Sequence, residues 1–312
     1  MISVDLSVII CTLNRSGLLR KCLESLAQQE AGAFTFETIV VDNGSTDDTK
    51  VVTESFRTRI NGLRYVLEPL RGLARARQTG FEASVGKYVA YLDDDAIAAR
   101  CWCSVICETF DQTGQSPADK VAALGGPIEP RFETGRPSWL THELESLYAI
   151  VDMGNELHSF LGSGSPTGAN MTFLRTILLE NPWDHRLLMC EEINLFARLR
   201  SKGFKFLYVP DMKVQHFISA KRLNREWLLR RYFAEGIAHT HLPLGTLHKT
   251  RVAIAAFVKL PFLLAFSRFG SEGRRLKYRC KLRFYHGYIA ALMGFRDPNS
   301  TEYISARRSA TF

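Results

Sequence analysis

Three consecutive carboxylates have the residue type and spacing to bind a cation. Asp93, Asp94 and Asp95 directly follow the apolar segment Tyr88–Leu92, which is typical of a buried strand. Adjacent carboxylates at one strand end repel each other, and each raises the pKa of its neighbours. A divalent cation removes this penalty, and oxygen ligands select Mg²⁺ or Mn²⁺. Because Mg²⁺ usually completes its coordination shell with substrate phosphates, the motif points to a diphosphate-bearing ligand.

Polar residues also follow two earlier apolar segments. Leu6–Cys11 leads into Thr12, Asn14 and Arg15, and Phe36–Val41 leads into Asp42–Ser45. The first turn offers hydroxyl, amide and guanidinium groups, which are suited to holding a nucleotide. The same residue types are ordinary in turns and helix caps, so the pattern alone leaves both explanations open.

The elements that must position these residues alternate between strand and helix. We expect helices after the first three of four strands, the strands being Leu6–Cys11, Phe36–Val41, Leu63–Leu67 and Tyr88–Leu92. This alternation indicates a parallel α/β sheet, in which ligands bind beyond the carboxyl ends of the strands. The sequence contains no GxxxxGK[ST] and no GxGxxG motif. It is therefore unlike an ordinary P-loop ATPase or a dinucleotide dehydrogenase.

Beyond residue 100 the alternation weakens. We expect residues 127–145 to form a long connection, because they are rich in Pro, Gly and charge. Further elements are expected at Trp102–Phe110 (helix), Val121–Gly125 (strand), Asn170–Leu174 (strand), Glu191–Lys202 (helix) and Phe206–Val209 (strand). The second helix opens with Glu191 and Glu192, where a helix N-terminus favours negative charge.

Composition and charge describe a globular chain with a basic C-terminal part. The chain has 312 residues, 46% of them hydrophobic and 23% charged, which excludes a largely disordered protein. The net charge is +8, and residues 249–312 alone contribute +10. The seven cysteines form neither a disulfide framework nor a zinc-site spacing, which favours the cytoplasm. No nucleic-acid-binding motif is present, so we expect no nucleic-acid partner.

The C-terminal part also contains short apolar segments. Val252–Phe266 is apolar but contains Lys259 and Pro261, and it is shorter than the roughly 20 residues that span a bilayer. Apolar stretches beside a basic cluster favour helices that lie in the interface of an anionic membrane. The alternative is a helical pair that packs on the body with a solvated basic face. The first explanation predicts peripheral association with the inner face of the cell membrane.

Taken together, the motifs resemble the family 2 glycosyltransferases. Five segments occur in the order typical of the family: SVIICTLNR, VVDNGSTDDT, GLARARQTGFEASVGKYVAYLDDDA, GANMTFLR and CEEINLFARLRSKGFKFLYVP. His216 follows the last of them. The resemblance covers about residues 5–240 and implies a GT-A fold: α/β, with a Rossmann-like mixed sheet flanked by helices. It implies a nucleotide-sugar-binding half (1–100) and an acceptor-binding half (101–223). A basic helical extension (224–312), which we expect to associate with membrane, would follow.

The resemblance also implies roles for individual residues. The nucleotide end of the donor would contact Thr12, Asn14, Arg15 and Asp42. Arg77 would lie near the donor, although Gln78 stands where the family usually has Asn. The donor and its metal ion would be bound by Asp93, Asp94, Asp95 and His216, with Asp95 as the direct metal ligand and Asp93 and His216 beside it.

Glu191 and Glu192 stand where the family usually has Glu-Asp, whose second member is the catalytic base. A glutamate is one methylene longer than an aspartate, so its carboxylate would be displaced by about 1 Å, an error that can cost about 100-fold in rate. We favour Glu192 as the base, with Glu191 as the next candidate. The implied reaction is metal-dependent, inverting transfer from a nucleoside-diphosphate sugar to a glycan or lipid-linked acceptor in surface polysaccharide synthesis.

Two other functions compete with this one. A sugar nucleotidyltransferase should have a Gly-rich basic loop after the first strand, and Cys11–Arg15 lacks it. A non-catalytic membrane- or polyanion-binding protein on the same fold would not need Asp93, Asp95 and Glu192, which are all present.

Overall fold

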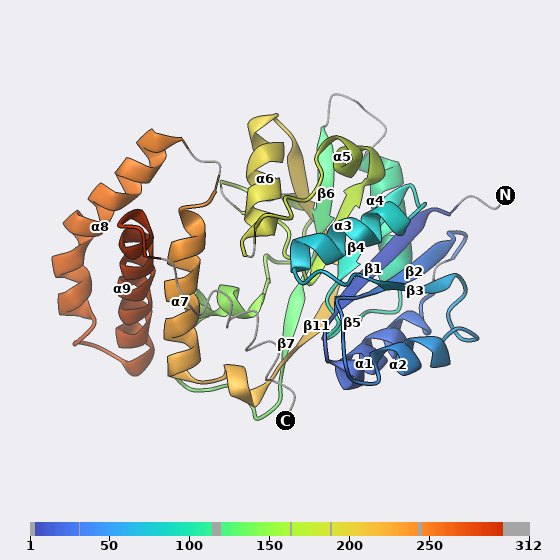
Figure 1. Cartoon of the computed structure of the whole chain (residues 1–312), viewed down its shortest axis with the longest axis horizontal. Coiled ribbons are helices and arrows are strands. Elements are labelled where there is room, and N and C mark those ends of the chain that lie inside the picture. Colours follow the sequence, from blue (N-terminus) through green and yellow to red (C-terminus); the bar gives the residue numbers. More distant parts are fainter. Residues whose placement is uncertain are drawn as a thin grey trace.

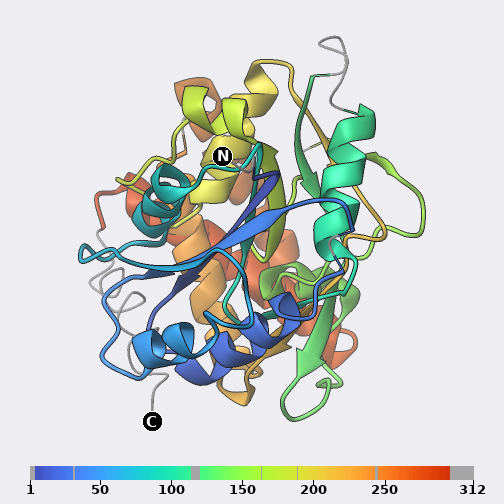
Figure 2. The same ribbon diagram turned by 90° about the vertical axis from the view of Figure 1, so that its right-hand side faces the viewer.

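The computed structural model describes residues 4–30, 32–113, 120–162, 164–187, 189–242 and 245–295. Its centre is an eight-stranded mixed sheet with helices on both faces (Figure 1, Figure 2). The strand order is β3-β2-β1-β4-β9-β6-β10-β8. The strands are β1 (Leu6–Thr12), β2 (Phe36–Asp42), β3 (Leu63–Leu67), β4 (Tyr88–Leu92), β6 (Val121–Gly125), β8 (His158–Ser159), β9 (Asn170–Leu174) and β10 (Lys205–Tyr208).

The first four strands are parallel, as the alternation predicts. Strand β9 runs antiparallel to both β4 and β6, so the sheet is mixed and the expected GT-A architecture is confirmed. Successive side chains of a strand point to opposite faces. Ile9 and Ile39 face α3 (Leu73–Ala83) and α6 (Glu191–Ser201). Their neighbours Val8 and Val40 lie in the other core, with α1 (Ser16–Leu26), α2 (Thr49–Ser55) and α4 (Trp102–Thr113).

A second, three-stranded sheet lies beside the first. Its order is β5-β11-β7, with β5 at Ala96–Ala98, β11 at Val214–Ile218 and β7 at Ile128–Phe132. The prediction that residues 127–145 form only a connection was therefore wrong, since they contain β7 and the start of the 3₁₀ helix η1 (His142–Tyr148). In β7 only Ile128 is buried, so this strand lacks the apolar run that marks the others. Strand β5 begins directly after Asp95, and β11 carries His216, so this sheet positions both residues.

Helix α1 directly follows the polar turn after β1. Ser16 is its first helical residue, and the helix ends at Leu26. The Ser16 N–H donates to Asp47 Oδ2 over 2.9 Å, so a carboxylate from the next loop satisfies this helix end. A short helix, α5 (Arg175–Glu180), follows β9.

Three helices form the C-terminal extension: α7 (Arg225–His239), α8 (Thr246–Phe266) and α9 (Glu272–Leu292), which follow the 3₁₀ turn η2 (Ala220–Arg222). Helices α7 and α9 cross closely, because a Cβ at Gly236 or Gly287 would collide with backbone of the other helix. Helix α8 lies on the outer side and packs on α9 (Figure 1). Within the described ranges, no helix combines the length and apolar character needed to cross a bilayer.

The extension shares a hydrophobic core with the body of the protein. Buried Leu228 of α7 and Cys280 of α9 join Tyr148 of η1 and Ile218 of β11 in one cluster. The predicted boundary near residue 224 therefore falls inside a continuous packed region.

Candidate active site

The polar turns after β1, β2 and β4 meet at one edge of the large sheet. Thr12 and Asp42 are paired in the register of β1 and β2, and β4 lies on the other side of β1. The Thr12 hydroxyl donates to Asp94 Oδ2 over 2.8 Å. Residues that the sequence separates thus lie together beyond the carboxyl ends of the strands, where α/β sheets bind ligands.

Asn14 and Asp42 shape the turns that carry them. Asn14 has a left-handed φ of 53°, its N–H donates to Ser45 Oγ and its Oδ1 accepts from the Thr46 N–H. Asp42 is buried and accepts from the Ser45 N–H and the Tyr65 hydroxyl, both over 2.7 Å. These bonds tie the first two turns together. Their contact with a nucleotide stays a prediction.

Arg15 bridges two of the three consecutive carboxylates. Its Nη1 lies 2.5 Å from Asp94 Oδ1, and its Nη2 lies 2.6 Å from Asp95 Oδ2. Burial raises the pKa of Asp94 to about 6, although the Arg15 charge opposes this shift. Thr12 and Arg15 occupy both oxygens of Asp94, so in this geometry Asp94 positions other side chains. The predicted contacts of Asp94 and Arg15 with the donor stay predictions.

Asp93, Asp95 and His216 form a candidate metal centre. Each offers a ligand atom, and the three atoms lie within 4.8 Å of one another. Burial raises the pKa of Asp93, and the negative charge of Asp95 adds to this effect. The cost of ionising the buried Asp93 beside Asp95 is the kind that a bound cation removes.

The hydrogen bonds of His216 suit a metal ligand. Its Nδ1 lies 2.9 Å from the carbonyl oxygen of Tyr148, which can only accept, so Nδ1 carries the hydrogen. When the ring carries no second hydrogen, it presents the lone pair of Nε2 to Asp95 Oδ1, 3.1 Å away. That Asp95 oxygen is buried without a hydrogen-bond donor. Two converging lone pairs fit a divalent cation, and a backbone carbonyl at the far ring nitrogen is typical of metal-binding histidines.

The second acidic group opens helix α6. Glu192 Oε1 lies 2.7 Å from Arg77 Nη2, and Glu192 Oε2 accepts from the Gly168 N–H over 3.0 Å. Glu191 Oε1 lies 2.9 Å from Arg77 Nη1. The Glu192 side chain is 26% exposed and that of Glu191 is 8% exposed. Glu192 is therefore the carboxylate that a second substrate can reach more readily.

Arg77 brings the two acidic groups into one site. Its Nη2, which contacts Glu192, also lies 4.0 Å from Asp93 Oδ1. The residue is 2% exposed, and its guanidinium lies 5.2 Å from the centre of the Trp183 ring. Asp93 and Glu192 therefore lie near the same nitrogen atom of a single buried guanidinium group.

Sequence reasoning missed two residues of this site. Gly168 has no space for a side chain, because a Cβ there would lie 2.9 Å from Glu192 Cδ and closer still to Arg77 Nη2. Arg222 Nη1 lies 3.9 Å from Asp95 Oδ2, and the Trp227 ring lies 5.2 Å from its guanidinium. Gly168 is part of the GANMTFLR segment, which was recognised without a role for the glycine. Arg222 lies in a 3₁₀ turn with no local pattern.

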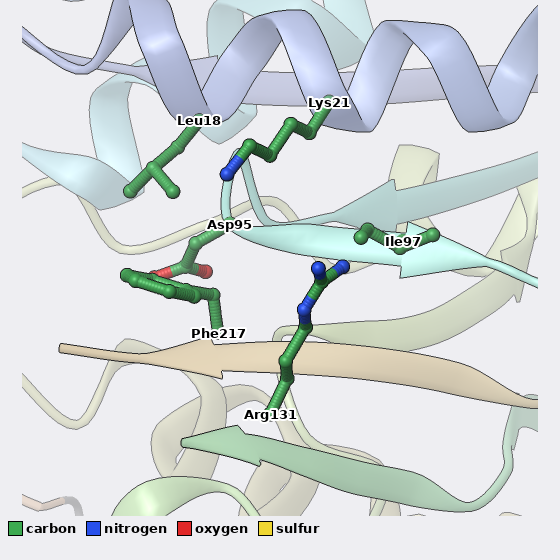
Figure 3. A pocket seen from close by; sticks show the side chains of 6 residues that line it. All are labelled: Leu18, Lys21, Asp95, Ile97, Arg131 and Phe217. Atoms are coloured by element: carbon green, nitrogen blue, oxygen red, sulfur yellow. The ribbon is translucent and has the colours of Figure 1, made fainter. Parts of the chain in front are cut away.

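A small pocket adjoins Asp95 where α1 meets the three-stranded sheet (Figure 3). It is lined by Leu18, Lys21, Asp95, Ile97, Arg131 and Phe217. Its cavity volume of about 10 Å³ has room for about one water molecule. This pocket is therefore too small to hold a sugar nucleotide.

Comparisons with known proteins agree with the fold. Residues 7–141 match the family model described as "Glycosyl transferase family 2". The chain is 34% identical to Glycosyltransferase AglE of Haloferax volcanii over 209 residues, which cover 66% of this chain and 64% of AglE. It is 23% identical to the succinoglycan biosynthesis protein ExoM of Rhizobium meliloti, with 95% of both chains covered. This chain thus spans less than two thirds of AglE.

Two solved structures share the fold. The mannosyltransferase PcManGT of Pyrobaculum calidifontis, in complex with GDP-Man and Mn²⁺, aligns with a TM-score of 0.56 at 16% identity, covering 100% of this chain and 84% of PcManGT. TarS 1–349 of S. aureus in complex with UDP aligns with a TM-score of 0.53 at 16% identity, covering 94% and 93%. At these identities the likeness concerns the fold alone. The matching family model and the relatives support a family 2 glycosyltransferase, and the likeness to the two solved structures shows the GT-A fold.

Proposed function

We propose that this protein transfers a sugar, with inversion, from a nucleoside-diphosphate sugar to a hydroxyl group of a glycan or lipid-linked acceptor. The observation that carries the proposal is the contact of Arg77 with both Asp93 and Glu192. An in-line displacement needs a base for the attacking hydroxyl and stabilisation of the departing diphosphate across the reacting carbon. The similarity to ExoM, a succinoglycan biosynthesis protein, supports a glycan product.

Glu192 is the residue that accepts the proton of the acceptor hydroxyl. Arg77 and the Gly168 N–H each fix one of its oxygens. Each carboxylate oxygen has a second lone pair, so either one can still accept the hydroxyl hydrogen. The two fixed contacts also compensate for the extra methylene of a glutamate, because they determine where its carboxylate lies. Glu191 shares Arg77 and is more buried, so its role is to hold the guanidinium in place.

On the donor side, Asp93, Asp95 and His216 would hold a divalent cation, Mg²⁺ or Mn²⁺. When bound, such a cation neutralises charge that develops on the diphosphate leaving group. Arg222 supplies a further fixed positive charge beside Asp95, in a position where it can contact the same diphosphate. The Tyr148 carbonyl orients the ring of His216 for this task.

Binding of nucleotides and metal tests the donor side of the proposal. Thermal unfolding is followed with UDP, GDP and dTDP, each with and without Mn²⁺. One nucleotide should stabilise the protein only when Mn²⁺ is present, by about 2.7 kcal/mol at 100 times its dissociation constant. Asp95→Asn should remove this stabilisation, and Asp152→Asn, at an exposed site, should retain it. Absence of a response to every nucleotide would contradict the proposal.

The two alternative functions receive less support. The match to a glycosyltransferase family model opposes a sugar nucleotidyltransferase. A non-catalytic binding protein would not require a half-buried glutamate to be fixed by two separate donors. Turnover of a sugar nucleotide by the full chain would exclude it directly.

A further inference from the structure

Helix α8 exposes a continuous apolar face that no other described part of the chain covers. This docking face consists of residues at i, i+3, i+4, i+7 and i+8: Ile254, Phe257, Val258, Pro261 and Phe262. Phe257 is 70% exposed and Phe262 is 64% exposed. The opposite side of the helix carries the buried Ala256 and Leu263, and α8 packs on α9. An exposed apolar face of this extent marks an interaction site.

The two helices α8 and α9, which include the docking face, are strongly basic. Between residues 245 and 295, ten Lys and Arg residues stand against a single acidic residue, Glu272. Arg275, Arg279 and Arg283 follow at i, i+4 and i+8 and so lie on one side of α9. Arg275 and Arg279 also line a pocket between α7 and α9. None of these three forms an ion pair with a described acidic residue, so their charge is available to a partner.

We infer that the C-terminal extension docks onto an anionic lipid bilayer. The docking face would enter the boundary between headgroups and acyl chains, and the arginines of α9 would meet the lipid phosphates. Apolar side chains bordered by cations match a bilayer, in which anionic headgroups border an apolar interior. Such docking would place the enzyme at a membrane surface without a spanning helix. The inference does not depend on the proposed reaction.

Flotation of the full chain with lipid vesicles tests the role of the docking face. The protein should bind vesicles of phosphatidylcholine with phosphatidylglycerol, and high salt should weaken this binding. Phe257→Ser with Phe262→Ser should lower partitioning by more than about tenfold, because two aromatic rings no longer enter the interface. The matched control is Val51→Ser with Leu179→Ser, which removes exposed apolar side chains from α2 and α5 and should leave partitioning unchanged.

The charge contribution is tested separately. Replacing Arg275, Arg279 and Arg283 together by Gln should lower binding to anionic vesicles about fivefold per removed charge. The matched control replaces three exposed cations elsewhere, by Arg20→Gln, Lys50→Gln and Lys213→Gln. These controls should bind as the parent protein does.

Three results would overturn the inference. The first is that the parent protein does not bind anionic vesicles. The second is that the Phe257→Ser, Phe262→Ser variant binds them as well as the parent protein does. The third is a stable dimer in sedimentation velocity that this variant dissociates, because a second copy would then cover the docking face. Turnover of a soluble donor should be the same in all variants, which separates this test from that of the proposed reaction.

Discussion

Replacement of Gly168 by alanine should abolish most of the activity while leaving the fold intact. The added methyl group would lie 2.9 Å from Glu192 Cδ, and closer to Glu192 Oε1 and Arg77 Nη2, whereas ordinary contacts of a Cβ begin at 3.4 Å. Gly168 does not have a positive φ, so its backbone accepts alanine. The glutamate and the guanidinium must therefore move.

The required movement fixes the expected magnitude. Restoring ordinary contacts displaces the Glu192 carboxylate by about 1 Å, and such an error costs about 100-fold in rate. The strain of the added methyl group costs about 1–3 kcal/mol of folding free energy. We therefore expect kcat to fall about 100-fold while the melting temperature falls by only a few degrees.

The assay compares donor turnover and transfer by Gly168→Ala with those of Gly17→Ala. Gly17 also has no positive φ, and a Cβ there meets nothing within 4 Å. The control should keep full activity and the nucleotide affinity of the parent protein. If Gly168→Ala kept parental activity while its fold and nucleotide binding were intact, Glu192 would not be the base held in this position.

Three further predictions follow from the same geometry. Glu192→Gln should lower kcat by about 100- to 10,000-fold without weakening nucleotide binding, whereas Glu191→Gln should lower kcat less. If steady-state kinetics showed the larger loss of kcat for Glu191→Gln, Glu191 would be the base. His216→Ala should raise the Mn²⁺ concentration for half-maximal activity more than about tenfold, and His185→Ala, at an exposed site, should not. Full activity after treatment with a chelator would contradict the metal assignment. Arg222→Ala should lower kcat/KM for the donor about 10- to 100-fold, the value of a hydrogen bond to a charged group; an unchanged kcat/KM would show that Arg222 does not contact the diphosphate.

The first half of the fold could be predicted because its signals are local. Strands buried on both faces need continuous apolar runs, and Leu6–Cys11 and Tyr88–Leu92 have them. Polar residues that end such strands must meet at one edge, so Thr12 and Asp94 could be expected to lie near each other. Strand β7 was missed because it is mostly exposed and has no such run.

The connections within the site could not be predicted in this way. Arg77 and Glu192 are 115 residues apart in the sequence, and no periodicity links them. Gln78 and Glu192 depart from the family pattern, and only the structure shows that two donors fix the carboxylate of Glu192. Arg222 reaches Asp95 from an irregular turn that the packing of α7 and η1 places there. Such contacts depend on the whole fold and not on local sequence.

The C-terminal helices also help to fix the position of His216. The carbonyl that orients its ring belongs to Tyr148, and the Tyr148 ring stacks on Trp227 of α7 at 5.3 Å. Helix α7 in turn packs on α9, so both helices support the position of His216, the proposed metal ligand. A truncation that ends before α7 would therefore remove the support of His216 as well as the helices that we expect to bind lipid. Substitutions of surface residues, rather than truncations, are therefore needed to test membrane binding separately from catalysis.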